Sequence, residues 1–320
     1  MNKNQDSLIS EEQQNKIIAF ARLRARWNTI IIIFSIILLI LPIGYLSTMI
    51  YYATNDKANN EILTLETIYS LTQPNLKIDD TKVKTEFNPF FGFKISAPIN
   101  KQVGSENLKV GNYNSNIEFG IKKASTADLT IQPIPMDLRE KEFAFIPPNQ
   151  NIPSSLSTSW DNLNKIPNGT VSEVFLSLDK AYESNEIENF ISKYDVKILW
   201  NAVDTGLEKN MEDSNGSVIT PIGYPEKNSP PSNSYFTAKN NKELFVEQLK
   251  YLKDQNNIAK NIMGEASVGA KERLKYIDKN GIKIYGIVVT GPSKEILEMK
   301  DLKEIRGMYI GETDFWNWNR

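Results

Sequence analysis

An uninterrupted apolar run constrains this chain more than any other feature. Residues 28–52 read NTIIIIFSIILLILPIGYLSTMIYY, and no charged side chain occurs between Arg26 and Asp56. A helix rises about 1.5 Å per residue, so about 20 residues cross the roughly 30 Å hydrocarbon core of a bilayer. A secretory signal has a shorter apolar region followed by small residues, whereas this run continues into Tyr51 and Tyr52. We therefore predict an uncleaved transmembrane helix over residues 28–52.

Basic residues flank this run unequally. Lys16, Arg22, Arg24 and Arg26 precede it, whereas Lys57 is the basic residue immediately after it. Because Lys and Arg next to a span resist translocation, we expect the N-terminus in the cytoplasm and the residues after the span outside the cell. The expected location is the cell membrane, crossed once.

Residues 1–27 are the expected cytoplasmic segment and contain one predicted amphipathic helix. It begins near Ser10, where Gln13 helps to form a pattern close to a capping box. A stripe about 120° wide on the helical wheel carries four large apolar side chains, which are Ile17, Phe20, Leu23 and Trp27. Such a stripe can lie on the anionic inner leaflet, extend the span or dock a cytoplasmic partner. These four residues are the candidate partner-binding residues.

The composition excludes much familiar chemistry. The chain has 320 residues with no Cys and no His, and its formal net charge is −2. Disulfides, thiolate zinc sites, cysteine nucleophiles, Ser-His-Asp triads and His-ligated metals are thereby excluded. A general nucleic-acid binder needs a basic surface, and an ATP-driven protein needs a glycine-rich phosphate loop, which this sequence lacks. We therefore expect no cofactor, no metal and no nucleic-acid partner.

Residues 53–150 are predicted to form a juxtamembrane stalk and a β-rich subdomain. The stalk becomes a short helix within 56–69, where apolar residues recur at helical spacing. Short apolar segments between Gly, Asn and Pro then predict strands at 91–97, 108–113, 117–122, 129–134 and 143–146. The run from 146 to 169 is dense in Pro, Asn and Ser, which indicates a boundary between two subdomains.

Residues 151–320 are predicted to form an α+β sensor-like domain around a mixed sheet. Its predicted strands are 170–178, 196–203, 282–290 and 307–311, and its predicted helices are 184–192, 241–253, 267–279 and a short one after Gly291. The apolar run at 282–290 favours a central strand covered on both faces. A long polar loop is expected over 207–234.

Several short motifs allow an enzymatic interpretation. Asp204-Thr205-Gly206 matches the core of the aspartic protease signature, although such a sequence is also an ordinary turn. Ser177 and Lys180 fit the Ser-x-x-Lys pattern of penicillin-interacting enzymes, but no Lys-Thr-Gly follows. The aromatic run at 315–318 can clamp a glycan or peptide, or fill a seam between subdomains. Paired carboxylates of a glycosidase cannot be located from sequence alone.

Three segments of the C-terminal half carry a family resemblance: KILWNAVDTG at 197–206, KIYGIVVTGPSKEILEMK at 283–300 and IRGMYIGETDFWNW at 305–318. They resemble the sigma factor regulator family, the membrane-bound anti-sigma factors of Gram-positive bacteria. RLRARWN at 22–28 and LTQPN at 71–75 are similar to the N-terminal part of that family. The resemblance implies an extracytoplasmic-function sigma factor as partner and an outer domain that responds to envelope stress. The predicted tail is short for that task, so the partner is expected to bind directly or through a second membrane protein.

Two hypotheses follow. The first is a non-enzymatic, single-pass regulator of transcription that couples an extracytoplasmic domain to a cytoplasmic partner. The alternative is a surface-anchored hydrolase that acts on cell-wall polymer or peptide, with Asp204 as its best candidate residue.

Overall fold

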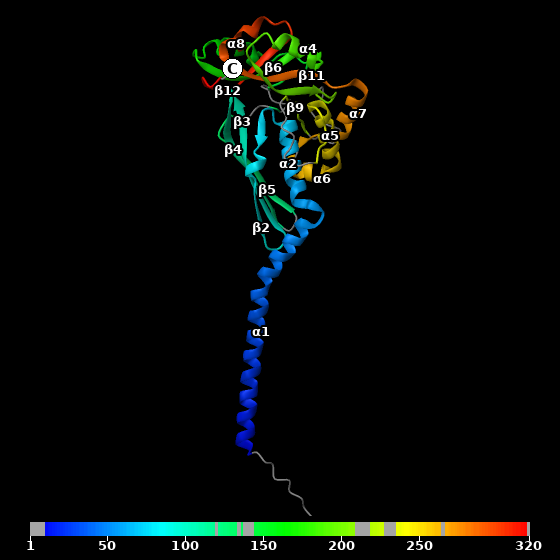
Figure 1. Ribbon diagram of the computed structural model, residues 1–320. Helices are drawn as coiled ribbons and strands as arrows, with labels where there is room; N and C mark the ends of the chain where they lie inside the picture. The colour runs from blue at the N-terminus through cyan, green and yellow to red at the C-terminus, as the bar shows by residue number, and fades with distance from the viewer. Residues whose placement is uncertain are drawn as a thin grey trace, which may run out of the picture.

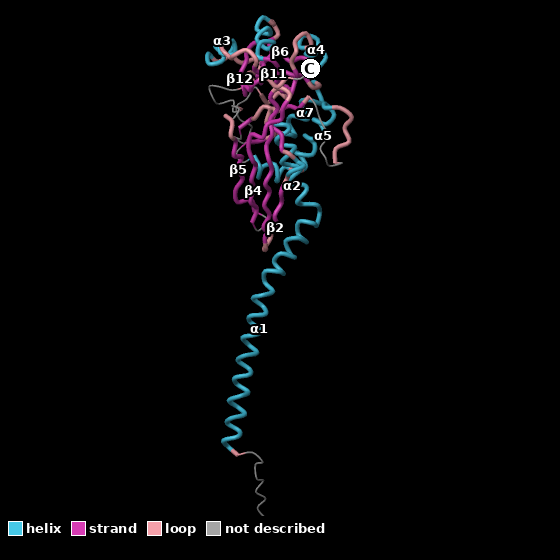
Figure 2. Tube along the Cα trace, turned by 60° about the vertical axis from the view of Figure 1, so that its left-hand side comes forward, coloured by secondary structure: helices cyan, strands magenta, loops and turns pink. Residues whose placement is uncertain are grey.

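A single long helix forms a stem below a folded head in the computed structural model (Figures 1 and 2). The structure describes residues 10–118, 121–132, 136, 144–208, 218–226, 235–263 and 266–318. Helix α1 runs without a break from Glu11 to Ala53 and contains Pro42. Among the described residues it is the one helix long and apolar enough to cross a membrane. The predicted amphipathic helix that begins near Ser10 and the predicted span are thus one continuous helix.

Helix α2 (Lys57–Thr72) follows α1 after the short turn η1 (Thr54–Asp56) and lies inside the head. The helix predicted after the span is therefore present, within the head. One set of its side chains, Leu63, Ile68 and Leu71, joins the core of the C-terminal sheet. Leu65 and Tyr69 join the core of the N-terminal sheet. The helix that continues from the stem is therefore buried between the two halves of the head.

The N-terminal half of the head is an antiparallel sheet in the order β1-β3-β4-β5, with β2 paired to β3. Its strands are β1 (Leu76–Ile78), β2 (Lys84–Asn88), β3 (Gly92–Val103), β4 (Glu106–Glu118) and β5 (Ile121–Leu129), with the turn η2 (Asp80–Lys82) after β1. Buried and less buried residues alternate along β3, as expected for a strand with one face on a core. The β-rich prediction for this half is confirmed.

Three strand predictions in this half were wrong in detail. The predicted strand at 117–122 spans the end of β4 and the start of β5, so a chain reversal lies inside it. Of the predicted strand at 129–134, Leu129 is the last residue of β5, and the described residues 130–132 are not in a strand. Residues 144–146 form no strand, because the Ile146 N–H donates to the Ser177 hydroxyl instead of to a strand partner. Phe143 lies outside the described residues.

The C-terminal half is built on a sheet in the order β12-β6-β11-β7-β9. Its strands are β6 (Thr170–Tyr182), β7 (Lys197–Asp204), β9 (Gly223–Pro225), β11 (Lys283–Pro292) and β12 (Ile305–Phe315). Every neighbouring pair is antiparallel, so this sheet is antiparallel and not mixed as expected. The central position of β11 is confirmed, and all its residues after Lys283 are buried. The α+β class is confirmed.

Helices cover this sheet on the side of the largest core (Figure 1). They are α3 (Ser159–Asn164, after the turn η3, Ser154–Thr158), α4 (Ser184–Ile191), α5 (Asn241–Asp254), α6 (Asn256–Met263), α7 (Ala270–Asn280) and α8 (Ser293–Glu298, followed by the turn η4, Met299–Asp301). The predictions of α4, α5, α7 and α8 are confirmed to within a few residues, and α3 and α6 were missed. The predicted loop at 207–234 lies partly outside the described residues, but it contains β9 and β8 (Val218–Ile219), which pairs with β10 (Ala266–Ser267).

A buried polar seam joins the two halves. The Lys101 ammonium on β3 lies 2.7 Å from the Glu173 carboxylate on β6, and their side chains are 1% and 0% exposed. The Asn75 amide donates to Glu173 at 2.6 Å and to the Gln102 carbonyl at 2.7 Å. Two charges in such a position are costly unless they are paired, so these contacts fix how the sheets dock. The expected boundary at residue 150 stays a prediction, because α2 and this seam connect the parts on either side.

Candidate functional site

The tail of α1 presents the four predicted partner-binding residues together. The Ser10 hydroxyl accepts from the Gln13 N–H at 3.3 Å, and the Gln13 side chain accepts from the Ser10 N–H at 3.1 Å. This capping box satisfies two of the free donors at the start of the helix. The apolar side chains remain exposed, at 57% for Ile17, 67% for Phe20, 52% for Leu23 and 57% for Trp27. Whether they bind a partner stays a prediction.

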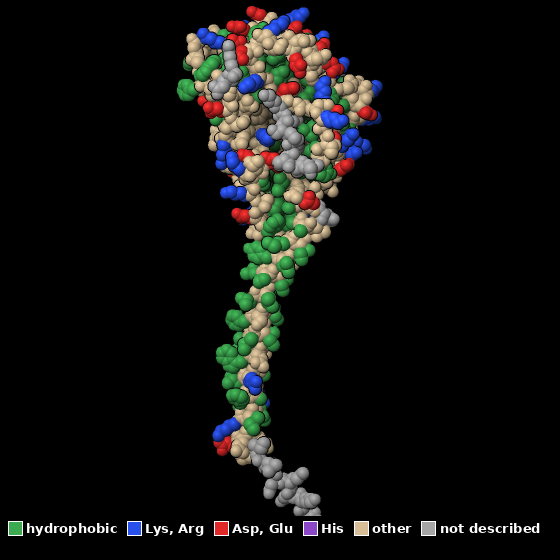
Figure 3. All heavy atoms as spheres, in the orientation of Figure 1, with side chains coloured by type: hydrophobic (Ala, Val, Ile, Leu, Met, Phe, Trp, Pro, Cys, Tyr) green, Lys and Arg blue, Asp and Glu red, His purple; other side chains and the backbone are tan. Residues whose placement is uncertain are grey.

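The basic residues of the tail lie on the same helix, next to the apolar span. Arg22, Arg24 and Arg26 are exposed, and Lys16 pairs with Glu12 at 2.8 Å on the surface. In Figure 3 the stem between these residues and the base of the head is covered mainly by hydrophobic side chains. This distribution of charge suits a helix that leaves the bilayer at its basic end.

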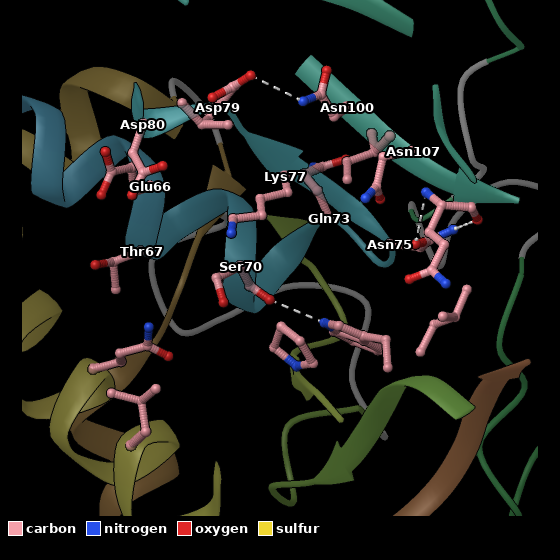
Figure 4. A pocket seen from close by; sticks show the side chains of 18 of the residues that line it. Glu66, Thr67, Ser70, Gln73, Asn75, Lys77, Asp79, Asp80, Asn100 and Asn107 are labelled. Carbon is pink, nitrogen blue, oxygen red and sulfur yellow. Dashed lines mark hydrogen bonds between the residues drawn. The ribbon is translucent and has the colours of Figure 1, made fainter. Parts of the chain in front are cut away.

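A pocket of about 420 Å³ lies in the head where α2, β1, β7 and α5 meet (Figure 4). Apolar side chains form part of its wall, among them Leu63, Trp200 and Leu244. The Trp200 ring is fixed there because its Nε1–H donates to the Ser70 carbonyl at 3.0 Å. A pocket with an apolar wall and a few polar groups is the usual form of a small-molecule site.

The polar side of this pocket contains a hydroxyl with unused hydrogen-bonding capacity, because Thr67 Oγ1 is buried without a partner among the described residues. The Gln248 side chain, 4% exposed, also lines this side. Burial raises the pKa of the Glu66 carboxyl to about 7; the nearby Asp80 carboxylate adds to the rise, and the Lys77 ammonium opposes it. In Figure 4 Glu66 lies beside Asp80, and Lys77 points into the same space. The pocket can thus exchange hydrogen bonds, and a proton, with water or a small polar ligand.

Asp204 occupies a turn and not a catalytic dyad. Its carboxylate accepts from the Gly206 N–H at 3.0 Å and from the Tyr276 hydroxyl at 3.0 Å. Gly206 has a φ of 79°, and a Cβ there would meet the Tyr276 ring at 2.4 Å, so glycine is required. The adjacent Thr205 donates to the buried Glu208, which forms an ion pair with Arg273. The Asp-Thr-Gly sequence thus serves a structural turn.

The other two motifs also have structural roles. The Ser177 hydroxyl is fully buried and accepts from the Ile146 N–H at 2.9 Å, whereas Lys180 is exposed and lies over the Tyr182 ring. In the aromatic run, Trp318 is 6% exposed and donates to Asp195 at 3.0 Å. Phe315 and Trp316 are exposed, so this run is divided between a seam and the surface.

Within the described part of the chain, no group of three or more Asp, Glu, His or Cys side chains is placed to hold a metal ion.

The pocket residues were missed by sequence reasoning. Glu66, Lys77 and Gln248 come from three separate elements, and each is an ordinary polar residue of a surface helix or strand in the sequence. Thr64, Thr67 and Ser70, polar residues interspersed among the buried apolar side chains of α2, are the signal that could have pointed there.

Among the described residues, one helix is apolar enough to cross a membrane; it has a basic, capped extension at one end and the folded head at the other. This is the architecture of a single-pass membrane protein. Residues 15–108 match the model described as sigma factor regulator N-terminal, and residues 163–312 match sigma factor regulator C-terminal. The chain is 32% identical over 318 residues to the probable anti-sigma-M factor YhdL of Bacillus subtilis (strain 168). The aligned region covers 98% of this chain and 86% of the relative. No solved structure matches.

The chain therefore belongs to the sigma factor regulator family. It is a membrane regulator of the anti-sigma-factor type, and the hydrolase alternative is not favoured. The family is generally non-enzymatic, which agrees with the structural roles of Asp204 and Ser177.

Proposed function

We propose that this chain restrains an extracytoplasmic-function sigma factor at the cytoplasmic face of the membrane. The N-terminus lies in the cytoplasm, the head lies outside the cell, and the sigma factor binds the stripe formed by Ile17, Phe20, Leu23 and Trp27. The observation that carries the proposal is the exposure of these four side chains on one face of a capped helix next to the basic end of the span. An amphipathic helix that offers such anchors to a groove is a common recognition mode.

The family supports the partner class. The relative in Bacillus subtilis bears the name of a probable anti-sigma-M factor, and both family models are named for sigma factor regulation. The cytoplasmic tail is short and can cover only part of a sigma factor. A second membrane protein that completes the contact is therefore compatible with this proposal. The head then biases the equilibrium between bound and released sigma factor, which requires a few kcal/mol of differential affinity.

Two matched substitutions in the same helical turn test the proposal. Phe20→Asp places a charge in the middle of the stripe, whereas Ile18→Asp makes the same kind of change on the opposite face, where Ile18 is 47% exposed. Loss of a central aromatic anchor costs about 2 kcal/mol or more, which is about thirtyfold in affinity. We expect a sigma factor to co-purify with the solubilised wild-type chain and with Ile18→Asp, but not with Phe20→Asp.

Membrane fractionation is the control, because both variants should remain in the membrane through the unchanged span. Equal recovery of a sigma factor with both variants would mean that the stripe lies on the leaflet and not on a protein. Recovery that depends on a co-purifying membrane protein would place the partner contact in a larger complex, with Phe20→Asp still expected to weaken it.

A further inference from the structure

The hairpin between β2 and β3 reaches down to the upper part of the apolar helix α1 (Figure 1). Hydrogen bonds join the two. The Thr48 hydroxyl on α1 lies 2.9 Å from the Asn88 carbonyl and 2.9 Å from the Gly44 carbonyl, so its one proton is shared between these two acceptors. The same hydroxyl accepts from the Phe91 N–H at 2.8 Å. The Phe90 N–H donates to the Gly44 carbonyl at 3.4 Å, and the Tyr52 hydroxyl donates to the Phe91 carbonyl at 3.3 Å. The hairpin tip, residues 89–91, is therefore held at a defined height on the stem.

One stripe of α1 is shaped to receive this tip. Gly44, Thr48 and Tyr52 are the buried residues of α1, and their spacing of four places them on one face. A Cβ at Gly44 would meet the Pro89 Cβ at 3.0 Å and the Phe90 ring at 3.3 Å, so glycine permits the close approach. The Tyr51 ring contacts the Phe91 ring edge to face at 5.1 Å.

The height of this contact lies within the membrane-spanning part of the helix. Trp27 and Gly44 are about 26 Å apart along an ideal helix axis, and the hydrocarbon core is about 30 Å thick. With Trp27 at one interface, Gly44 lies about 4 Å inside the opposite boundary, and a tilt of the helix places it deeper. Lys57, whose ammonium lies 3.5 Å from the centre of the Tyr51 ring, is the first basic residue on the aqueous side.

The chemistry of the tip suits that depth. No charged residue occurs between Glu86 and Lys94, which face each other across the hairpin. Phe90 and Phe91 are 42% and 36% exposed in the absence of lipid. Both have positive φ, 60° and 63°, in a region that bulky residues rarely occupy and that Gly or Asn enters at lower cost. Aromatic side chains thus stand in a turn whose backbone favours other residues.

We propose that residues 89–91 insert into the bilayer leaflet next to the head, alongside the spanning helix. The partner of this surface is lipid: acyl chains and the headgroup region contact the Phe90 and Phe91 rings. The head is then held to the membrane at two points, the helix and the hairpin tip. The head therefore cannot turn freely about the helix axis. A tilt or rotation of the head moves the end of α1 with it.

The absence of Cys permits a direct test by site-specific labelling. Phe90→Cys is labelled with an environment-sensitive fluorophore in the full chain, reconstituted in vesicles of phosphatidylcholine and phosphatidylglycerol. The control is Lys84→Cys, an exposed position at the opposite end of β2, about 13 Å further from the tip. Two quenchers of fluorescence are compared. Iodide is dissolved in the water on both sides of the vesicle membrane, and nitroxide groups are attached to the lipid acyl chains.

We expect acyl-chain nitroxide to quench the Phe90 probe several-fold more than the Lys84 probe, and iodide to show the reverse order. A Phe90 probe quenched by iodide and not by nitroxide would overturn the proposal. Protection from both quenchers would also overturn it, because the tip would then be covered by protein. Phe91→Cys repeats the measurement at an independent position, and near-UV circular dichroism shows that each labelled chain has kept its fold.

Discussion

At the scale of single residues, the Lys101–Glu173 ion pair is the contact on which the docking of the two sheets depends most. Both side chains are essentially buried, and Glu173 also accepts from Asn75 and from the Glu312 N–H. Lys101→Met leaves the carboxylate buried without its cation, which costs about 3–5 kcal/mol. We expect a lower midpoint of urea unfolding for this variant. Adding Glu173→Gln should recover part of the loss, and a midpoint equal to wild type in Lys101→Met would contradict this account.

Glu66 gives the head a dependence on pH. Its pKa in the folded chain is about 7, against an ordinary value of 4.5, so the folded state binds this proton more tightly than the unfolded state. The contribution of Glu66 to stability is therefore complete below about pH 4.5 and is lost as the pH rises to and beyond about 7.

The substitution Glu66→Gln tests this dependence, because the amide keeps the shape of the side chain and cannot ionise. We expect a higher thermal unfolding midpoint than wild type at pH 8 and little difference at pH 4.5. The exposed Glu86→Gln on β2 is the control and should show no such pH-dependent difference. A variant that is less stable than wild type at pH 8 would show that the charged form is favoured in the pocket.

Residue patterns predicted single contacts poorly. The capping box at Ser10 was predicted because it is local, and the structure confirms it. Asp204 and Ser177 match catalytic motifs, but their partners, Tyr276 and Ile146, are brought to them by tertiary structure. For the same reason neither the Lys101–Glu173 pair nor the unpartnered Thr67 hydroxyl could be found by spacing.

At the scale of secondary-structure elements, the contact between the β2–β3 hairpin and α1 can be loosened without touching the hairpin itself. Thr48→Val keeps the volume of the side chain and removes both its bonds to the hairpin. Each hydrogen bond contributes about 1 kcal/mol, and buried groups left unpaired cost more. We expect faster amide hydrogen exchange at residues 88, 90 and 91 in this variant; Pro89 has no N–H. Ser47→Ala is the control, because that hydroxyl donates to the Ile43 carbonyl of its own helix.

Elements with a strong and continuous pattern were predicted well. The apolar run of β11 and the helical spacing of α5 each indicate one structure, and both are present. Prediction failed where local pattern and chain reversal compete, as between β4 and β5. The direction of strand pairing in the β12-β6-β11-β7-β9 sheet depends on the path of the chain between strands, so the sequence pattern favoured a mixed sheet wrongly.

At the scale of the whole molecule, regulation of a cytoplasmic partner by an outer head requires the two ends of α1 to face different compartments. The predicted span at residues 28–52 lies within the long helix α1, and the folded head begins where the apolar run ends. The division of the head at residue 150 was less informative, because α2 contributes to both cores. A linear sequence shows where a segment is apolar but not that one helix is shared between two sheets.

The most direct measurement of this topology uses two single cysteines in intact cells. Phe315→Cys places a thiol on the head at a side chain that is 85% exposed, and Asn15→Cys places one on the exposed tail. A membrane-impermeant maleimide should label position 315 in intact cells and position 15 only after the membrane is permeabilised. Labelling of position 15 in intact cells, with position 315 protected, would contradict a regulator that meets its sigma factor through the tail of α1.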